Sequence, residues 1–496
     1  MLSVIVFLPL VVAVGLLSAT WLADSMARWL FLAATLVEVV LVGIVWAGYH
    51  DPGTGRLAYQ EQVPWIPGVS SSYHVGVDGL SLPLVAMTVV VFAAGAVYAL
   101  RERDRPRLQA ALFLFLEGVS LGLFVSADLI VFFVFFDLSI VAMYFSIAGW
   151  GQGDAARSAM KFFLYTFLGS LALLLGFIGL YVAADPHTFD MVELARATPL
   201  AGSPVAGALV LAAILLGLAV KTPTFPFHTW LPSAHTDAPA IGSLVLAAVL
   251  LKMGTYGFVR IAMPMLPQAW QAWAPVIIVI GVISVLYGAL VALAQTDLKR
   301  MIAYTSVNHM GYIVLAVGVA GVISRDTEQA RAVAVTGAVT QMVSHGLVTG
   351  ALFLLAGVMR DRTGSYDIRE YGGLAAVAPR YIGLFAVAAF ASLGLPALSG
   401  FIAEFQVFTG SVAVVPVTAV ALLGILITAA LFLRALQAVF TGTTRGLSVD
   451  FTDLRPSETW SAGLLLALSL FVGVLPRPLL DVIEPAAHTV VGLVGR

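Results

Sequence analysis

A succession of long apolar runs limits this chain to one kind of fold. A helix needs about 20 apolar residues to cross the ~30 Å hydrocarbon core of a bilayer. Runs of that length begin near Val4, Leu30, Leu80, Ala110, Leu129, Phe162, Pro204, Ile241, Ala274, Ile302, Val335, Ile382, Pro416 and Trp460. Only 10% of the residues are charged, against about 25% in soluble domains. We therefore predict an all-α polytopic membrane protein with 14 transmembrane helices and no extramembrane domain.

The distribution of lysine and arginine predicts the orientation of these spans. If the N-terminus lies outside, the loops after odd-numbered spans hold 15 of the 25 basic residues, and the opposite loops hold 7. The remaining three fall within spans: Lys221, Lys252 and Arg434. Because basic loops stay in the cytoplasm, we expect both termini on the outer side of a bacterial inner membrane. The first run has no signal-peptide cleavage pattern and is predicted to be retained.

The absence of cysteine excludes several kinds of chemistry. Without thiols the chain forms neither a cysteine-ligated iron–sulfur cluster nor a disulfide. It also lacks a G-x-x-x-x-G-K-[ST] loop, so ATP hydrolysis is not expected. Its histidines do not cluster with a third type of ligand. We expect no metal, no cofactor in this chain and no nucleic-acid partner.

Two proline- and glycine-rich interruptions occupy corresponding spans. KTPTFP at 221–226, with Pro223 and Pro226, interrupts span 7, and GLPALSG at 394–400, with Pro396, interrupts span 12. Each is the fourth span of a group of five, spans 4–8 and 9–13, and a five-span repeat must be inverted because an odd number reverses sidedness. Broken helices in inverted repeats are typical of transporters. The predicted units are 1–108 (three helices), 109–266 (first repeat), 267–440 (second repeat) and 441–496 (cytoplasmic loop and last helix).

Lys252 lies in the middle of span 8. Its nearest aqueous end is roughly eleven residues away, or ~16 Å at the helical rise. A charge at that depth costs at least ~2.5–3.5 kcal/mol, and intramembrane charges usually serve a function. Asp137 in span 5 and Lys221 at the break of span 7 are predicted to pair, so that moving the carboxylate changes the proton affinity of the lysine. The alternatives are a structural ion pair between helices and a snorkelling Lys221.

Other ionisable residues in the spans extend this set. His309 and His345 suit a proton relay, because histidine titrates near neutral pH; the alternative is a pair of ordinary core histidines. Glu404 follows the second break and is predicted to release the proton, unless it only caps the broken helix. Glu117 is a candidate channel residue or a helix–helix contact. His228 and His235 are predicted to be interfacial, at the cytoplasmic end of span 7.

Several motifs carry a family resemblance over roughly residues 70–485. They are VKTPTFPFHTWLPSAHTDAP (220–239), LLKMGTYG (250–257), QTDLKRMIAYTSVNHMG (295–311), HGLVTGALF (345–353) and GLPALSGFIAEF (394–405). Together they resemble the antiporter-like proton-pumping subunits. YHVGVDGLSL (73–82) and the acid at Glu404, where sister families typically have lysine, make the chain most similar to the subunit M family of respiratory complex I, NADH:quinone oxidoreductase.

The resemblance implies a fold of 14 helices and a proton relay driven by redox chemistry in other subunits. It implies that Asp137, Lys221, Lys252, His309, His345 and Glu404 carry protons from the cytoplasm to the outer side. Flavin, iron–sulfur clusters and quinone are then expected in partner subunits, and antiporter-like subunits L and N are expected as neighbours in the bilayer. The family usually has glutamate where this chain has Asp137, one methylene shorter. Alternatives are a subunit of an Mrp-type Na⁺/H⁺ antiporter, a membrane-bound hydrogenase subunit, and a scaffold subunit.

Overall fold

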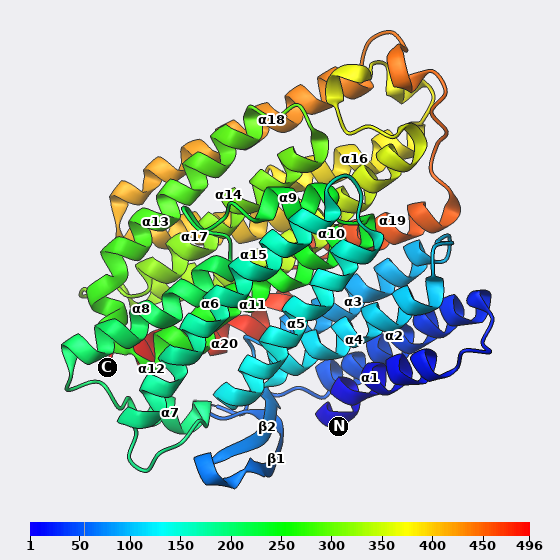
Figure 1. The fold of residues 1–496 in the computed structure, drawn as a ribbon. Coiled ribbons are helices and arrows are strands. Elements are labelled where there is room, and N and C mark those ends of the chain that lie inside the picture. Colours follow the sequence, from blue (N-terminus) through cyan, green and yellow to red (C-terminus); the bar gives the residue numbers. More distant parts are fainter. Residues whose placement is uncertain (54) are drawn as a thin grey trace.

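The protein is a bundle of long, roughly parallel helices (Figure 1). The computed structural model describes residues 1–53 and 55–496. In that part, 12 helical segments are long and apolar enough to cross a membrane. They are α2 (Asp24–Ala47), α3 (Leu82–Ala99), α4 (Pro106–Val125), α5 (Leu129–Trp150), α6 (Ala155–Ala183), α8 (Pro204–Lys221), α10–α12 (Ala240–Met265), α13 (Pro267–Leu293), α14 (Leu298–Val319), α15 (Glu328–Thr363), η6–α18 (Pro416–Phe440) and α19 (Pro456–Val474). The prediction of a polytopic helical membrane protein is confirmed.

The other two predicted spans take shorter forms. The first is α1 (Leu2–Ser18), an apolar helix of 17 residues. The predicted span 12 is divided into α16 (Pro379–Ser392) and α17 (Ser399–Val414). A last helix, α20 (Arg477–Val494), follows α19 and packs along α15. Two short helices, α7 (Met191–Ala197) and α9 (Leu231–Asp237), lie between the long ones.

A β-hairpin corrects the prediction that the chain is entirely helical. Strands β1 (Ala58–Ile66) and β2 (Ser71–Val77) pair antiparallel in the longest predicted loop. The search for apolar runs overlooked this segment because its strands are too short and too polar to resemble spans. The hairpin, α7 and both chain termini lie at the same end of the bundle (Figure 1), so the chain begins and ends on one side.

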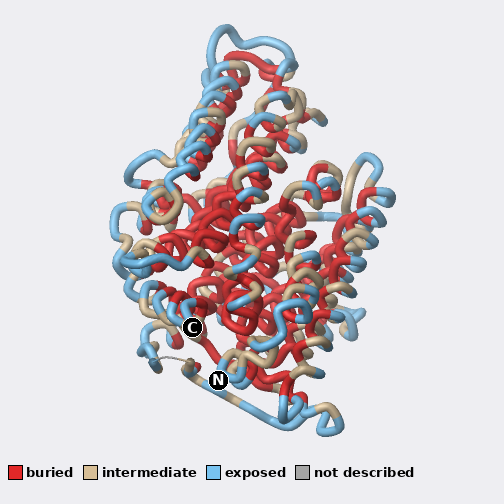
Figure 2. Tube along the Cα trace, turned by 90° about the vertical axis from the view of Figure 1, so that its left-hand side faces the viewer, coloured by how far each residue is buried: buried red, intermediate tan, exposed pale blue. Residues whose placement is uncertain are grey.

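The most enclosed helices occupy the centre of the bundle. The α10–α12 segment, α14 and α15 are almost completely buried (Figure 2), whereas α2, α6, α13 and α18 expose apolar side chains such as Val40 and Leu168. A lipid-facing helix can leave such residues uncovered, because hydrocarbon solvates them. The three central elements carry Lys252, His309 and His345, so the fold places these residues where no bulk water reaches them.

Candidate relay through the membrane

Lys221 lies at the end of a broken helix, as predicted. α8 ends at Lys221 and the next helix, α9, begins at Leu231. The intervening prolines cannot donate the backbone hydrogen bonds that would continue the helix. The Lys221 ammonium is buried and donates to Ser139 Oγ at 2.9 Å. It also lies 4.7 Å from the centre of the Phe136 ring, a distance typical of a cation–π contact.

The structure alters the predicted pairing of Lys221 with Asp137. No ion pair within 4.0 Å joins them in the described part of the chain, and Asp137 Oδ1 is buried without a hydrogen-bond partner. The lysine instead contacts α5 through Ser139, two residues further along the same helix. An aspartate is one methylene shorter than a glutamate and reaches less far, which agrees with this separation. Sequence reasoning overlooked Ser139, since an uncharged residue in an apolar run gives no signal.

Lys252 is fully buried in α11 (Leu251–Gly257), between two π-helical turns, η2 (Leu246–Leu250) and η3 (Phe258–Ala262). Such turns inside α-helices are frequently found at functional sites. They leave carbonyl groups without their usual partner, and Lys252 Nζ donates to one of them, Ala247 O, at 2.6 Å. Its second partner is Nδ1 of His345 on α15, also at 2.6 Å. The Lys252 ammonium therefore links α11 to α15 through this hydrogen bond.

The helix of Lys252 also contacts the break after Lys221. A Cβ placed on Gly254 would lie 2.8 Å from the Leu218 carbonyl oxygen and would overlap the Thr222 side chain. Thr222 Oγ1 is buried with no hydrogen-bond partner. The absence of a side chain at Gly254 thus allows the two lysine-bearing segments to lie backbone to backbone, although no hydrogen bond between Lys221 and Lys252 occurs in the described residues.

His345 and His309 meet in an arrangement that defines their tautomers. An ammonium donor at Nδ1 of His345 leaves the ring proton of the neutral histidine on Nε2. His309 Nε2 lies 3.1 Å from the Ser392 carbonyl oxygen and must therefore carry a hydrogen. The rings meet edge to face, with centroids 5.4 Å apart, and among the described residues His345 Nε2 and His309 Nδ1 have no hydrogen-bond partner. His345 Nε2 carries a hydrogen and is a donor, and His309 Nδ1 is an acceptor.

Glu404 completes the line on α17. Its Oε1 lies 3.9 Å from His309 Nε2, and a small cavity of about 10 Å³ lies among Glu404, both histidines and Ser392. That volume is close to the ~10–15 Å³ that one water needs. Gly394, at the break between α16 and α17, has φ +74° and faces the Glu404 carboxylate, so any Cβ there would overlap it. Glu404 also borders a groove between Phe401, Phe405 and Phe408 that opens to the side of the bundle.

Two histidines predicted to be interfacial are buried. His228 and His235 are both enclosed, and neither nitrogen of His235 has a hydrogen-bond partner among the described residues. The His235 ring stacks on Phe353, with centroids 4.2 Å apart. Nearby, Lys299 at the start of α14 is buried and donates to the Ala238 carbonyl at 2.6 Å. The prediction was wrong because α9 folds back into the protein after the break instead of reaching the membrane surface.

Glu117 does not join this line. It is fully buried on α4 with neither oxygen bonded, and so is Glu38 on α2, which packs against α4. Burying an ionised carboxylate without a partner costs much free energy unless the group is protonated or hydrated, so the two glutamates form a separate feature of the N-terminal helices. Within the described residues no three metal-ligating side chains cluster.

Comparisons with known proteins agree with this architecture. Residues 126–430 match the family described as NADH:quinone oxidoreductase/Mrp antiporter, transmembrane. NAD(P)H-quinone oxidoreductase chain 4 2 of Thermosynechococcus vestitus is 37% identical over 487 residues, covering 96% of this chain and 89% of the relative. NADH-quinone oxidoreductase subunit M of Rickettsia prowazekii is 35% identical, covering 97% and 96%.

A solved structure extends the likeness to the whole fold. A chain in the structure of respiratory complex I from Thermus thermophilus with bound NADH superposes with a TM-score of 0.87 at 30% identity, and the match covers 100% of both chains. The family match covers residues 126–430, and the relatives and the solved structure extend the likeness over nearly the full length. The chain belongs to the membrane-embedded NADH:quinone oxidoreductase/Mrp antiporter family, as an antiporter-like subunit of the complex I type.

Proposed function

We propose that this chain moves protons across the membrane through Lys252, His345, His309 and Glu404, driven by redox chemistry in other subunits of NADH:quinone oxidoreductase. The observation that carries the proposal is the alternation of donors and acceptors along this line. Lys252 contacts His345 Nδ1, and His309 Nε2 points to Glu404. Each histidine receives a proton on one nitrogen and releases another from the opposite nitrogen, which is how imidazole relays protons.

The transfer begins when Lys252 gives a proton to His345 Nδ1, which leaves a neutral amine and an imidazolium. His345 then releases its Nε2 proton to the unpartnered Nδ1 of His309. His309 in turn gives its Nε2 proton to the Glu404 carboxylate, across 3.9 Å, through one water or a small side-chain movement. Each step moves one proton and returns the histidine to a neutral form with its ring proton on the other nitrogen.

Uptake and control would lie on the other side of Lys252. We assign uptake to the buried Lys299–His235 region, which leads toward Lys252 from the end of the bundle where α14 begins. We assign control to Lys221 and Asp137, whose charge state raises or lowers the cost of a proton on Lys252. Glu117 is retained only as a candidate channel residue.

The wider assembly follows from the same proposal. We propose 14 spans with two inverted five-helix repeats, covering 109–266 and 267–440 between the N-terminal helices 1–108 and the C-terminal part 441–496. The chain would lie in a bacterial inner membrane with both termini outside and with subunits L and N as neighbours. Flavin, iron–sulfur clusters and quinone would belong to partner subunits. The division of α8 from α9 and of α16 from α17 supports the repeats.

Replacement of Lys252 tests the proposal. Lys252→Ala in the assembled complex, reconstituted in sealed vesicles, should abolish the proton pumping that this subunit contributes, and native electrophoresis should show normal assembly. The matched control is Lys161→Ala, which removes an exposed lysine and should pump like the wild type. Unchanged pumping by a correctly assembled Lys252→Ala complex would refute the relay. Sodium-dependent pumping would instead favour the Mrp-type alternative.

A further inference from the structure

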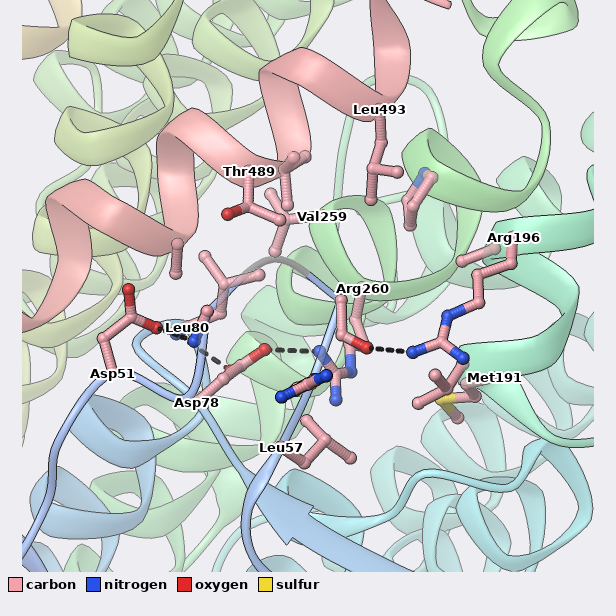
Figure 3. A pocket seen from close by; sticks show the side chains of 18 residues that line it. Asp51, Leu57, Asp78, Leu80, Met191, Arg196, Val259, Arg260, Thr489 and Leu493 are labelled. Atoms are coloured by element: carbon pink, nitrogen blue, oxygen red, sulfur yellow. Dashed lines mark hydrogen bonds and ion pairs between the residues drawn. The ribbon is translucent and has the colours of Figure 1, made fainter.

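A pocket with both charged and apolar lining residues lies outside the relay, at the end of the bundle that carries the hairpin (Figure 3). It has a volume of about 80 Å³, well above the ~10–15 Å³ that one water needs. The loop before β1, α7, the η3–α12 region and α20 enclose it. Three arginines line it: Arg56, Arg196 and Arg260. Two aspartates, Asp51 and Asp78, also line it.

The aspartates neutralise only part of this positive charge. Arg260 Nη1 lies 2.5 Å from Asp78 Oδ2, in a largely buried ion pair. Arg196 donates to the Gly55 carbonyl at 3.1 Å, and Arg56 donates no side-chain hydrogen bond to any described residue. Asp51 accepts from the Gly53 amide at 3.1 Å. Three guanidinium groups thus face two carboxylates, one of which is already paired.

An unsatisfied donor in the pocket wall points to a missing partner. Arg260 Nε is buried and has no acceptor in the described part of the chain. A buried donor without a partner costs about 1–3 kcal/mol, so such groups usually have a water or ligand nearby. In Figure 3 the Arg196 guanidinium points toward the part of the pocket where Arg260 contacts Asp78.

The grouping of arginines is unusual for this end of the molecule. Only seven basic residues fall in the loops assigned to this side: Arg56, Arg196, Arg260, Arg325, Arg331, Arg477 and Arg496. Three of the seven line one pocket. The rest of the lining is mainly apolar and includes Leu57, Val259 and Leu493 of α20. A ligand with an anionic group next to an apolar part would fit these arginines and the apolar lining beside them.

We propose that this pocket binds a phosphate oxyanion, presented either by the headgroup of an anionic phospholipid or by free inorganic phosphate. Guanidinium groups bind phosphate oxygens in pairs of parallel hydrogen bonds, which a lysine cannot do. Arg56 and Arg196 are exposed at the mouth and make the first contact with the anion. Arg260 forms the floor, and the bound anion joins the loop before β1 to α7 and α20.

The test compares two double variants of the assembled complex. Arg56→Gln with Arg196→Gln removes the two positive charges at the mouth of the pocket but leaves the Arg260–Asp78 pair intact. Arg325→Gln with Arg477→Gln removes two exposed arginines from the same end outside the pocket. One arm measures binding of radiolabelled inorganic phosphate to delipidated complex. The other measures, by native mass spectrometry, phosphatidylglycerol retained from nanodiscs that contain phosphatidylglycerol and phosphatidylcholine.

The expected result is a loss of at least about tenfold in affinity or in retained lipid for the pocket variant, from the loss of two charge-assisted contacts. The control variant should match the wild type. A difference confined to the phosphate arm assigns the site to the free anion, and one confined to the nanodisc arm assigns it to lipid. If the pocket variant equals the control in both arms, the proposal is overturned.

Discussion

The contact between Lys221 and Ser139 gives the sharpest prediction, because it replaces the ion pair that the sequence predicts. Ser139→Ala should impair proton pumping although it changes no charge. The serine hydroxyl is the only hydrogen-bond acceptor recorded for the Lys221 ammonium among the described residues. A hydrogen bond to a charged group contributes about 1.5–3 kcal/mol. Its loss therefore changes the equilibrium constant for the position or the protonation of the lysine by about tenfold to 150-fold.

The assay is the initial rate of NADH-driven acidification in sealed inside-out vesicles, normalised to the amount of assembled complex. If the position of Lys221 limits turnover, the Ser139→Ala rate should fall about tenfold or more. Ser146→Ala is the matched control. Ser146 lies two helical turns further along α5 and is equally buried, but its hydroxyl has no partner, so its loss should change the rate less than twofold.

A second comparison separates this interpretation from the predicted ion pair. Asp137→Asn removes the carboxylate but leaves the Ser139 contact. If the serine holds Lys221 in place, Ser139→Ala should impair pumping at least as much as Asp137→Asn. Wild-type pumping by Ser139→Ala, with strong loss in Asp137→Asn, would refute the reasoning and restore the direct pair.

Three further predictions concern other parts of the chain. Gly394→Ala should destabilise the protein by at least about 1–2 kcal/mol, the cost of a left-handed residue with a Cβ, and should also slow pumping. Gly383 has open space around it, so Gly383→Ala should have neither effect. Melting temperature and vesicle acidification are the measurements. Burial alone would raise the pKa of Asp190, but the His74 ring and the helix N-terminal amides lower that pKa overall. The ionised carboxylate therefore stabilises the fold above the unfolded-state pKa of ~3.9, and this contribution is lost as the pH falls through the lower, folded-state pKa. Asp190→Asn should lower the melting temperature at pH 7, and the difference from the wild type should shrink toward pH 3. His235→Phe should leave assembly intact, since the aromatic stack is kept, but should slow proton uptake at least severalfold; equal pumping by this variant would exclude His235 from the path.

The sequence predicted the charged residues of the site far better than their contacts. Intramembrane charges such as Lys252 and Glu404 stand out because hydrocarbon makes each one costly, and the breaks at Pro223 and Pro396 stand out because proline ends helices. The Lys252–His345 contact joins residues 93 positions apart, and only the packing of α11 on α15 brings them together. Periodicity along one helix carries no information about that packing.

Some features left no signal that apolar-run reasoning detects. Ser139 and Thr222 are small polar residues, and the membrane spans of this chain contain many serines and threonines. The π-helical turns around Lys252 arise from one extra residue per turn, which neither hydropathy nor composition reveals. The burial of His235 depends on the path of the chain after the break. A broken helix bearing histidines was nevertheless a reason to expect them inside the protein, because irregular backbone at membrane depth must be covered by protein or water.

The contacts of Lys252 suggest why transfer has a direction. Its hydrogen-bond partners are Ala247 O and His345 Nδ1, and of these two only the imidazole nitrogen can take up a proton. Lys221 then acts through its charge. The repulsion between two unit charges at an effective dielectric constant of ~20 is about 4 kcal/mol at ~4 Å and falls as their separation grows, so its effect on Lys252 depends on where the Lys221 ammonium lies. In the proposed mechanism a charged Lys221 close to Lys252 favours the proton on His345, and this repulsion weakens as Lys221 moves away; the Ser139 contact on α5 fixes the position of Lys221 in this structure. The relay would therefore be gated by the position of one ammonium group, and the Ser139 hydroxyl that holds it becomes part of the gate.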